Sequence, residues 1–230
     1  MMKSAFLEFI RHVVSGDVGA VSEQIMADPA LATASAEIGA SRENAEDFFF
    51  NEINHYLYGG DTALHMAAAA FRRPIAELLV AHGADHQARN RRGAGPLHYA
   101  ADTNHWEPTA QADTLLYLLS VGADPNARDK DGVSPLHRAV RTRSLPAVMS
   151  LLYGGADPII RNKAGSTPLH LAVQTTGRGG SGSEHALEQQ AGIIALLLER
   201  GARATDRDSR GKQVFEAATS DRIRSLLVGG

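Results

Sequence analysis

Four histidines stand at matching places in a recurring phrase, and histidine is the side chain that most readily binds metals or moves protons near neutral pH. The phrase reads GDTALHMAA, GAGPLHYAA, GVSPLHRAV and GSTPLHLAV in its four copies. Its histidines are His65, His98, His137 and His170. Equivalent histidines of this kind could form a metal site, a catalytic relay or a structural contact.

The spacing of these histidines indicates an internal repeat. His98 follows His65 by 33 residues and His170 follows His137 by 33, whereas His98 and His137 lie 39 apart. A second phrase recurs in the same register as HGADHQARN, VGADPNARD, GGADPIIRN and RGARATDRD. In one unit Ser134 stands where a helix N-cap belongs and Pro135 at the first helical position. Apolar residues at helical spacing follow, and a second apolar run ends at glycines, so each unit predicts two short helices and a turn.

These phrases and their period resemble those of ankyrin repeats. The resemblance implies an all-α repeat solenoid of stacked helix-turn-helix units with β-hairpin-like loops between them. We expect a single domain over residues 1–230, beginning with a divergent N-terminal repeat at 1–33 and an insertion at 34–58. The fuller repeats are expected at 57–88, 90–127, 129–160 and 162–205, and a C-terminal cap at 208–230.

The position of the histidines within each unit favours a structural role. Each follows the predicted N-cap by three residues, so its ring lies in the first helical turn and can bond back to the cap. Stacked helices lie about 8–10 Å apart, whereas zinc needs each nitrogen about 2.0–2.1 Å from a shared centre. A row of such histidines therefore cannot converge on one ion, and we expect no metal and no cofactor. The resemblance implies that each histidine ties adjacent hairpins together.

Composition and the remaining motifs predict a non-enzymatic protein. The chain has no cysteine, which excludes disulfides and thiolate metal sites, and no Gly-x-Ser-x-Gly or His-Glu-x-x-His motif. Its 23 basic and 26 acidic residues give a net charge of −3, which indicates no general preference for nucleic acid or anionic membranes. No apolar window is long enough for a membrane span. We predict a cytoplasmic monomer without a membrane partner.

The insertion at 34–58 is rich in aromatic residues. Ser41 is predicted to cap an extra N-terminal helix whose first turns are acidic. Phe49, Ile53, Tyr56 and Leu57 would then share one apolar face. Two roles follow for such a helix: it seals the junction of the first two repeats, or it forms an aromatic wall or lid at one end of a binding groove.

Two further insertions, at 104–112 and 175–190, fall between the paired helices. The first carries Trp106, which either packs over the base of its own loop or contacts a partner. The second contains GRGGSGS at 177–183. That stretch lacks the Gly-Lys-[Ser/Thr] ending of a phosphate-binding loop and follows no predicted strand, so we predict a mobile surface loop.

The resemblance also implies a binding surface, formed by the hairpin tips and the exposed side of the first helices. Carried over position by position, it predicts these partner-binding residues: Tyr58, Asp61, Arg91, Arg92, Asp102, Thr103, Lys130, Asp131, Val133, Arg141, Thr142, Lys163, Ser166 and Gln174. Five of them are basic, which favours an acidic segment of a partner protein. The alternatives are nucleic-acid binding through the same basic stripe, which lacks interleaved aromatic residues, and a small-molecule site beside the aromatic insertion.

Overall fold

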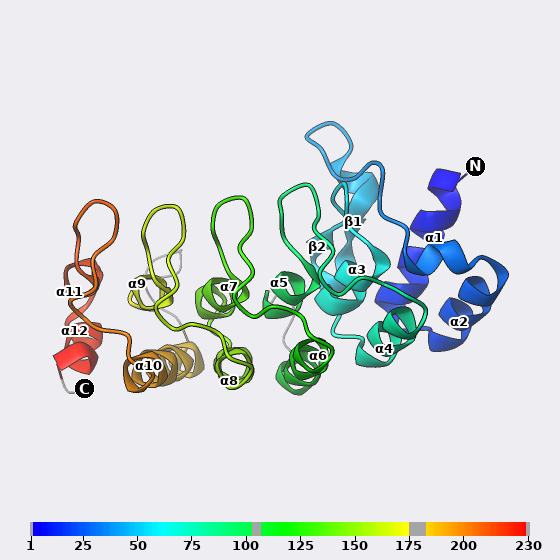
Figure 1. Ribbon diagram of the computed structural model, residues 1–230. Coiled ribbons are helices and arrows are strands. Elements are labelled where there is room, and N and C mark those ends of the chain that lie inside the picture. Colours follow the sequence, from blue (N-terminus) through cyan, green and yellow to red (C-terminus); the bar gives the residue numbers. More distant parts are fainter. Residues whose placement is uncertain (1, 103–106, 175–182, 229–230) are drawn as a thin grey trace. The chain divides into compact units, whose positions relative to one another are not determined.

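The computed structural model describes residues 2–102, 107–174 and 183–228 (Figure 1). The chain divides into two compact units, Met1–Asp124 and Pro125–Gly230. Within the described residues, the helices of each unit follow one another along the chain as three pairs. The repeated pairs confirm the predicted all-α repeat fold inside each unit.

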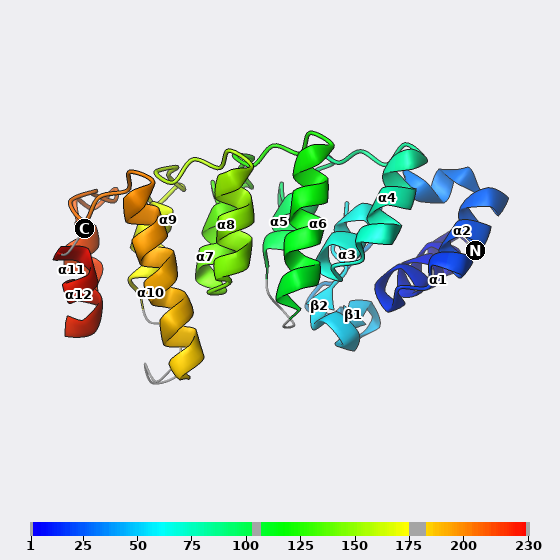
Figure 2. The same cartoon turned by 90° about the horizontal axis from the view of Figure 1, so that it is seen from below.

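The first unit packs its helices in two layers. They are α1 (Met2–Ser15), α2 (Val18–Ala27), α3 (Ala63–Ala69), α4 (Arg73–Ala81), α5 (Pro96–Ala101) and α6 (Pro108–Ser120). The first helices of the pairs form one layer, in which α3 packs between α1 and α5. The second helices form the other layer, in which α4 lies between α2 and α6 (Figure 2).

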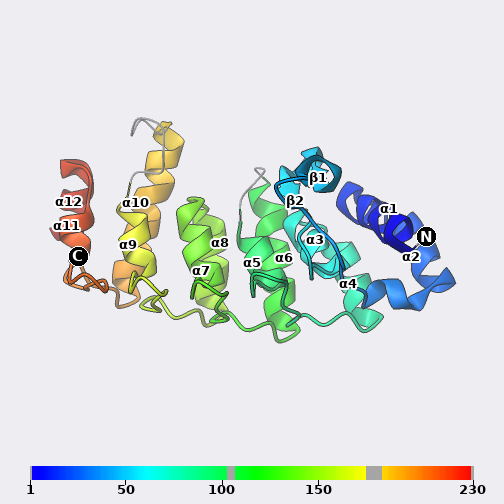
Figure 3. The ribbon, with the colours of Figure 1, turned by 90° about the horizontal axis from the view of Figure 1, so that it is seen from above.

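The second unit repeats this arrangement. Its helices are α7 (Pro135–Arg141), α8 (Leu145–Tyr153), α9 (Pro168–Ala172), α10 (Glu184–Glu199), α11 (Val214–Ala217) and α12 (Asp221–Val228). Helix α9 packs against α7 and α11, and α10 packs against α8 and α12 (Figure 3). The predicted C-terminal cap region thus contains a helix pair of its own.

Local sequence explains where the first helices begin. The Thr62 hydroxyl accepts the N–H of His65 at 3.4 Å, and the Ser134 hydroxyl accepts that of His137 at 3.4 Å. Each bond satisfies one of the N–H groups that a helix start leaves without an intrahelical partner. Proline at the first position of α5, α7 and α9 needs no such bond, because it has no N–H to satisfy.

Helix α3 is the centre of the first unit, and all seven of its residues are buried. Four of these residues are alanines. Small side chains at a helix contact shorten the distance at which helices can pack. The alanines therefore let α1 and α5 both lie close against α3.

The helix predicted within 34–58 is wrong. The segment instead forms a 3₁₀ turn (Ala45–Phe48), strand β1 (Phe49–Phe50), a second 3₁₀ turn (Asn51–Ile53) and strand β2 (His55–Tyr56). The strands pair antiparallel, Phe49 with Tyr56 and Phe50 with His55. Aromatic residues favour strands, and Asn54 takes a left-handed conformation, with φ 47°, that ends any helix.

The predicted cap of that helix is also replaced. The Asn44 side chain accepts the Ser41 N–H at 2.8 Å and the Ser41 hydroxyl at 2.6 Å. Such local bonds between side chains and backbone give the chain an alternative to a helix. Ser41 therefore closes a loop and caps no helix.

Helices occupy the second part of each of the loops predicted at 104–112 and 175–190. Helix α6 begins at Pro108 and α10 at Glu184, so the second part of each predicted loop extends a helix at its N-terminal end. The Ser183 hydroxyl caps α10 by accepting the N–H of Ala186 at 3.3 Å. Thr103, Trp106 and most of the glycine-rich stretch at 177–183 lie outside the described residues.

Candidate partner-binding surface

The four equivalent histidines are buried and hold the hairpins in place. In each, Nδ1 accepts the N–H of the residue three positions earlier, at 3.1 Å for His65, 3.2 Å for His98, 3.3 Å for His137 and 3.1 Å for His170. Because Nδ1 accepts, Nε2 carries the proton. The Nε2–H of His65 donates to the carbonyl of Ala94 at 3.0 Å, and that of His137 to the carbonyl of Ser166 at 3.0 Å. Each of these bonds joins a helix start to the following hairpin.

This bonding requires neutral imidazoles. Burial lowers the pKa of His137 and that of His170, although hydrogen bonds to the carbonyls of Ser166 and Lys212 act in the opposite direction. Both rings are therefore neutral near pH 7. Both nitrogens of such a ring are already engaged, and among the described residues no group of three or more His, Cys, Asp or Glu side chains could hold a metal ion.

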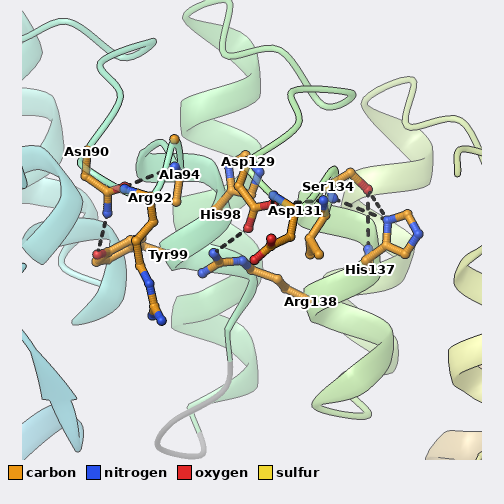
Figure 4. Close-up of polar contacts among 12 residues, drawn as sticks. Asn90, Arg92, Ala94, His98, Tyr99, Asp129, Asp131, Ser134, His137 and Arg138 are labelled. Atoms are coloured by element: carbon orange, nitrogen blue, oxygen red, sulfur yellow. Dashed lines mark hydrogen bonds and ion pairs between the residues drawn. The ribbon is translucent and has the colours of Figure 1, made fainter. Parts of the chain in front are cut away.

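Four hairpin tips, at residues 90–94, 129–133, 162–166 and 208–212, share one turn chemistry. Each begins with Asn or Asp, whose side-chain oxygen accepts two N–H groups of its own turn. Asn90 accepts from Arg92 and Ala94 at 2.8 and 3.0 Å, as Figure 4 shows. These bonds fix the backbone of each turn, and the two residues that follow each Asn or Asp are exposed to solvent.

We name the first of these hairpins, residues 90–94, the Arg91 tip. Its Arg91 and Arg92 side chains are exposed. The Arg92 guanidinium lies over the Tyr58 ring, 5.1 Å from the ring centroid. Within the described chain, neither arginine has a carboxylate partner at ion-pair distance. Both charges are therefore open to solvent and to a partner.

Tyr58 belongs to an aromatic cluster that the insertion builds against α5. We define this cluster as Phe49, His55, Tyr56, Tyr58 and Tyr99. The His55 ring lies 4.7 Å from that of Tyr99, and the Phe49 ring 4.6 Å from that of Tyr56. Tyr58 and Tyr56 are half-buried, so the cluster both packs the insertion onto the unit and keeps aromatic surface beside Arg92.

Asp61 does not lie on the surface, where a partner-binding residue was predicted. Its side chain is 0% exposed. Its carboxylate accepts the Tyr58 N–H at 2.6 Å, the Asn90 amide at 2.8 Å and the Tyr99 hydroxyl at 2.8 Å. A buried carboxylate is stable only with several such donors. Asp61 therefore joins the insertion, the Arg91 tip and α5.

Asp102 and Thr103 add little to the described surface. Asp102 follows the last residue of α5, and its side chain is 8% exposed. Thr103 lies outside the residues that the structure describes. Of the partner-binding residues predicted in the described part of the first unit, Arg91 and Arg92 are therefore exposed and Tyr58 is half-buried, whereas Asp61 and Asp102 are buried.

In the second unit, the tips at 129–133 and 162–166 carry Lys130, Asp131 and Lys163, all exposed. The Lys163 N–H donates to the carbonyl of Asp131 at 3.0 Å, which holds the two tips side by side. In the described part of the chain, neither lysine has a carboxylate at ion-pair distance. Val133 and Ser166 are half-buried behind the lysines.

Gly132 makes that close approach possible. Its φ is +73°, and a Cβ there would lie 2.8 Å from the backbone nitrogen of Lys163. Only glycine combines this conformation with contact to the next tip.

Beneath the Lys130 tip, Asp129 is held by several donors. Burial acts to raise the pKa of its carboxyl, but N–H groups of Val133 and Asp131 and the Arg138 guanidinium at 3.2 Å outweigh burial and lower that pKa. Arg141, the last residue of α7, is exposed. Thr142, the C-cap that follows it, is half-buried, and its hydroxyl donates to the Arg138 carbonyl at 3.1 Å. Gln174, just after α9, is exposed as well.

A family model for ankyrin repeats in three copies matches residues 107–208, and a second model, for the single ankyrin repeat, matches 59–91. Together they cover more than half of the chain. The chain belongs to the ankyrin-repeat family. Ankyrin repeats generally mediate protein–protein interaction, and such domains are typically non-enzymatic. No curated protein matches the sequence closely enough to assign a narrower relationship.

The ankyrin family agrees with the histidine geometry. The structure also shows two functional residues that the sequence motifs did not predict. The missed residues are Asn90 and Tyr99, which hold the Arg91 tip from inside. A signal for Asn90 was present, because Asn90, Asp129, Asn162 and Asp208 occupy one register position, three residues before a glycine. Tyr99 carried no such signal, since its counterparts in the other repeats are not aromatic.

None of the helices within the described residues of this ankyrin-repeat protein is both long enough and apolar enough to cross a membrane.

Proposed function

We propose that this ankyrin-repeat protein is a non-enzymatic module that binds an acidic segment of a partner protein through its hairpin tips and inner helices. The observation that carries the proposal is the exposure of Arg91, Arg92, Lys130 and Lys163 at these tips without a carboxylate partner among the described residues. Elsewhere the described arginines Arg73, Arg138 and Arg224 form ion pairs.

The rigidity of the tips supports this role. Asn90, Asp129 and Asn162 each fix their turn with two side-chain bonds, and the histidines fix the helix starts behind the turns. A surface that is already ordered loses little conformational entropy on binding. Exposed charges on such a surface raise the rate of association and select a partner of opposite charge.

Tyr58 supports a mixed contact in the first unit. The Arg92 guanidinium lies over its half-buried ring. A partner that approaches the Arg91 tip therefore contacts an aromatic face as well as a cation. Tyrosine and arginine are enriched among the residues that contribute most to protein interfaces. The proposal therefore expects an acidic segment with an apolar residue near its charges.

Charge reversal tests the proposal. One variant carries Arg91→Glu and Arg92→Glu, and a second carries Lys130→Glu and Lys163→Glu. The matched control carries Arg200→Glu and Arg203→Glu, which reverses the same amount of charge at exposed positions that belong to none of the tips at 90–94, 129–133 and 162–166. Each full-length variant is used to capture proteins from lysate, and a candidate partner is purified and titrated against all of them.

The expected result is a partner whose affinity falls at least tenfold with either tip variant and stays unchanged with the control. A verified partner that binds the wild type and both tip variants equally would overturn the proposal. Capture of DNA or RNA whose affinity falls steeply with salt would assign the tips to nucleic acid instead. Thermal unfolding of each variant, expected within a few degrees of the wild type, excludes loss of the fold.

A further inference from the structure

The insertion also builds a depression next to the Arg91 tip. Residues 36–40 run antiparallel to 57–61, with the Ala36 N–H donating to the Asp61 carbonyl at 2.7 Å and the Ala40 N–H to the Leu57 carbonyl at 2.8 Å. The Arg91 N–H then donates to the Gly59 carbonyl at 2.9 Å. Three backbone segments, residues 36–40, residues 57–61 and the Arg91 tip, thus meet at one place.

A depression of about 440 Å³ lies between them. Its lining includes Glu37, Ile38, Gly39, Gly59 and Arg91. Its volume lies near the lower end of the range for small-ligand sites, about 300–1,000 Å³. The depression therefore has room for the end of a chain and its last side chains.

Arg91 makes one wall of the depression cationic. Its guanidinium donates one bond, from Nη2 to the Ala40 carbonyl at 3.4 Å, which ties it to the insertion. Arginine has five N–H donors in a planar fork that matches a carboxylate. Since no described carboxylate pairs with Arg91, most of that fork is open.

Backbone donors add to this wall. In the described part of the chain, the N–H groups of Ile38, Gly39 and Gly59 have no hydrogen-bond acceptor, and all three residues line the depression. Backbone N–H groups without an acceptor, beside a cation, form the kind of concavity that captures a chain-terminal carboxylate.

Gly39 keeps these donors together. A Cβ at this position would lie 2.4 Å from the backbone nitrogen of Gly59 and 2.4 Å from the carbonyl carbon of Tyr58. Any side chain would therefore separate residues 36–40 from 57–61. The close backbone approach that forms the depression requires glycine here.

Ile38 supplies an apolar contact in the same depression. Its side chain is 44% exposed, so it offers aliphatic surface within the lining that also holds Arg91. The last residue of a polypeptide carries its carboxylate and its side chain on the same carbon. An aliphatic C-terminal residue can therefore place its carboxylate on Arg91 and its side chain on Ile38 together.

We propose that this depression binds the free C-terminal carboxylate of a partner polypeptide that ends in an aliphatic residue. The inference rests on the proposed protein-binding function and names one group that the partner presents to the first unit. Glu37, in the same lining, opposes any anion there, so its neutralisation strengthens binding.

Three sets of short acetylated peptides test this inference on the purified full chain. The first set ends in Val, Leu or Ile with a free carboxylate. The second has the same sequences as C-terminal amides, and the third is amidated with Glu in the last position. Binding is measured by fluorescence anisotropy, and the backbone amide signals of Gly39 and Gly59 are followed by NMR.

The free acids are expected to bind and to shift both glycine signals, whereas amidation weakens binding at least tenfold. Arg91→Gln weakens binding of the free acids about ten- to a hundredfold, as the loss of bonds between a cation and a carboxylate requires. Arg42→Gln is the matched control, because Arg42 is exposed in the same insertion, outside the lining, and its loss leaves affinity unchanged. Glu37→Gln is expected to increase affinity.

Absence of binding by the free acids would overturn the inference, and so would equal binding by amides or by the amidated Glu peptides. These outcomes differ from failure of the proposed function. If the peptides do not bind while a partner is still lost on charge reversal of Lys130 and Lys163, only the C-terminal inference fails. If peptides bind but no tip variant affects a partner, the proposed acidic-segment surface fails instead.

Discussion

The Arg91 tip and the Lys130 tip have the same turn but are supported in different ways. In the first unit, Asn90 fixes the turn with its oxygen and donates its amide to Asp61 and Tyr99. In the second unit, Asp129 fixes the turn and accepts a bond from Arg138 on α7. The turn residue of the first tip is therefore joined to the insertion through a buried network, whereas the side-chain bonds of Asp129 stay within its own repeat.

This difference shows that the insertion contacts the Arg91 tip. At the tip of residues 162–166, Asn162 bonds two N–H groups of the turn, and His137 bonds the Ser166 carbonyl. The Arg91 tip has in addition a buried carboxylate, an aromatic cluster and the depression lined by Ile38 and Gly39. The insertion thus adds a buried network and a depression to the Arg91 tip. Substitutions in each tip can measure how much these contacts contribute to stability.

The largest effect is expected from Asp61→Ala. The change leaves the Asn90 amide, the Tyr99 hydroxyl and the Tyr58 N–H without their buried acceptor. Three unsatisfied groups in the interior lower the free energy of unfolding by about 3 kcal/mol. Urea denaturation measures the loss, and hydrogen exchange is expected to rise in residues 57–62 and 90–94.

Asp131→Ala is the matched control in the second unit. Asp131 is exposed, so the free energy of unfolding should change by about 0.5 kcal/mol or less. Equal losses for the two variants would show that the buried network is not what distinguishes the two tips.

A smaller loss, about 2 kcal/mol, is expected from His137→Ala. The change removes the bonds of the ring to Ser134 and to the Ser166 carbonyl and leaves a cavity. His65→Ala removes the equivalent bonds and also the contact of the ring with Tyr99 at 5.1 Å, so it should cost more. Denaturation curves of both variants compare the units directly. A cost for His137→Ala that matches an exposed substitution would contradict the structural role.

Acid is expected to lower the free energy of unfolding of the second unit through His137 and His170. Their pKa values are lowered in the folded protein, so the unfolded chain binds protons first as the pH falls. The contribution of these two histidines to the free energy of unfolding is complete above about pH 6.5, the ordinary histidine pKa. It decreases as the pH falls below this value. The slope is at most about 1.4 kcal/mol per pH unit for each histidine.

Urea unfolding between pH 7.5 and 5 measures this slope, and His137→Gln should reduce it. The carboxyl of Asp129, whose pKa is lowered, acts in a separate range: its contribution is lost only as the pH falls below about 3.8. An unchanged slope in the His137→Gln variant would contradict the assignment of the acid effect to this histidine.

The smallest effect is expected from Arg92→Gln. Loss of the contact between the Arg92 guanidinium and the Tyr58 ring costs about 0.5 kcal/mol at an exposed site. Lys163→Gln, at a tip without such a contact, should cost less. A double-mutant cycle with Tyr58→Leu isolates the pair, and a coupling energy near zero would show that Tyr58 and Arg92 act independently.

Much of the fold could be predicted because it depends on neighbouring residues. A hydroxyl or glycine, a proline and a histidine in close succession specify where α5, α7 and α9 begin. The turns at the tips depend on local chemistry as well, because an Asn or Asp side chain bonds N–H groups only two and four residues further along. Such bonds form in the same way in every copy, and the residues that make them therefore recur in the sequence at the period of the repeat.

The insertion was predicted wrongly because local pattern and distant contacts disagree there. Phe49, Ile53 and Tyr56 have helical spacing, yet Phe49 and Tyr56 lie on paired strands. Residues 36–40 find backbone partners in 57–61, which a helix spanning 41–58 would not allow. Hydrophobic periodicity cannot register a competing backbone partner of this kind.

The sequence by itself determined the repeat, the helix starts, the turn at each tip and the charges that follow those turns, because each depends on residues a few positions apart. Only the tertiary structure decided that Asp61 is buried, that the insertion forms strands, and that Gly39, Gly59 and Arg91 share one depression. Asp61 needs donors from Asn90 and Tyr99, 29 and 38 residues away, and a sequence pattern does not specify whether such distant groups meet.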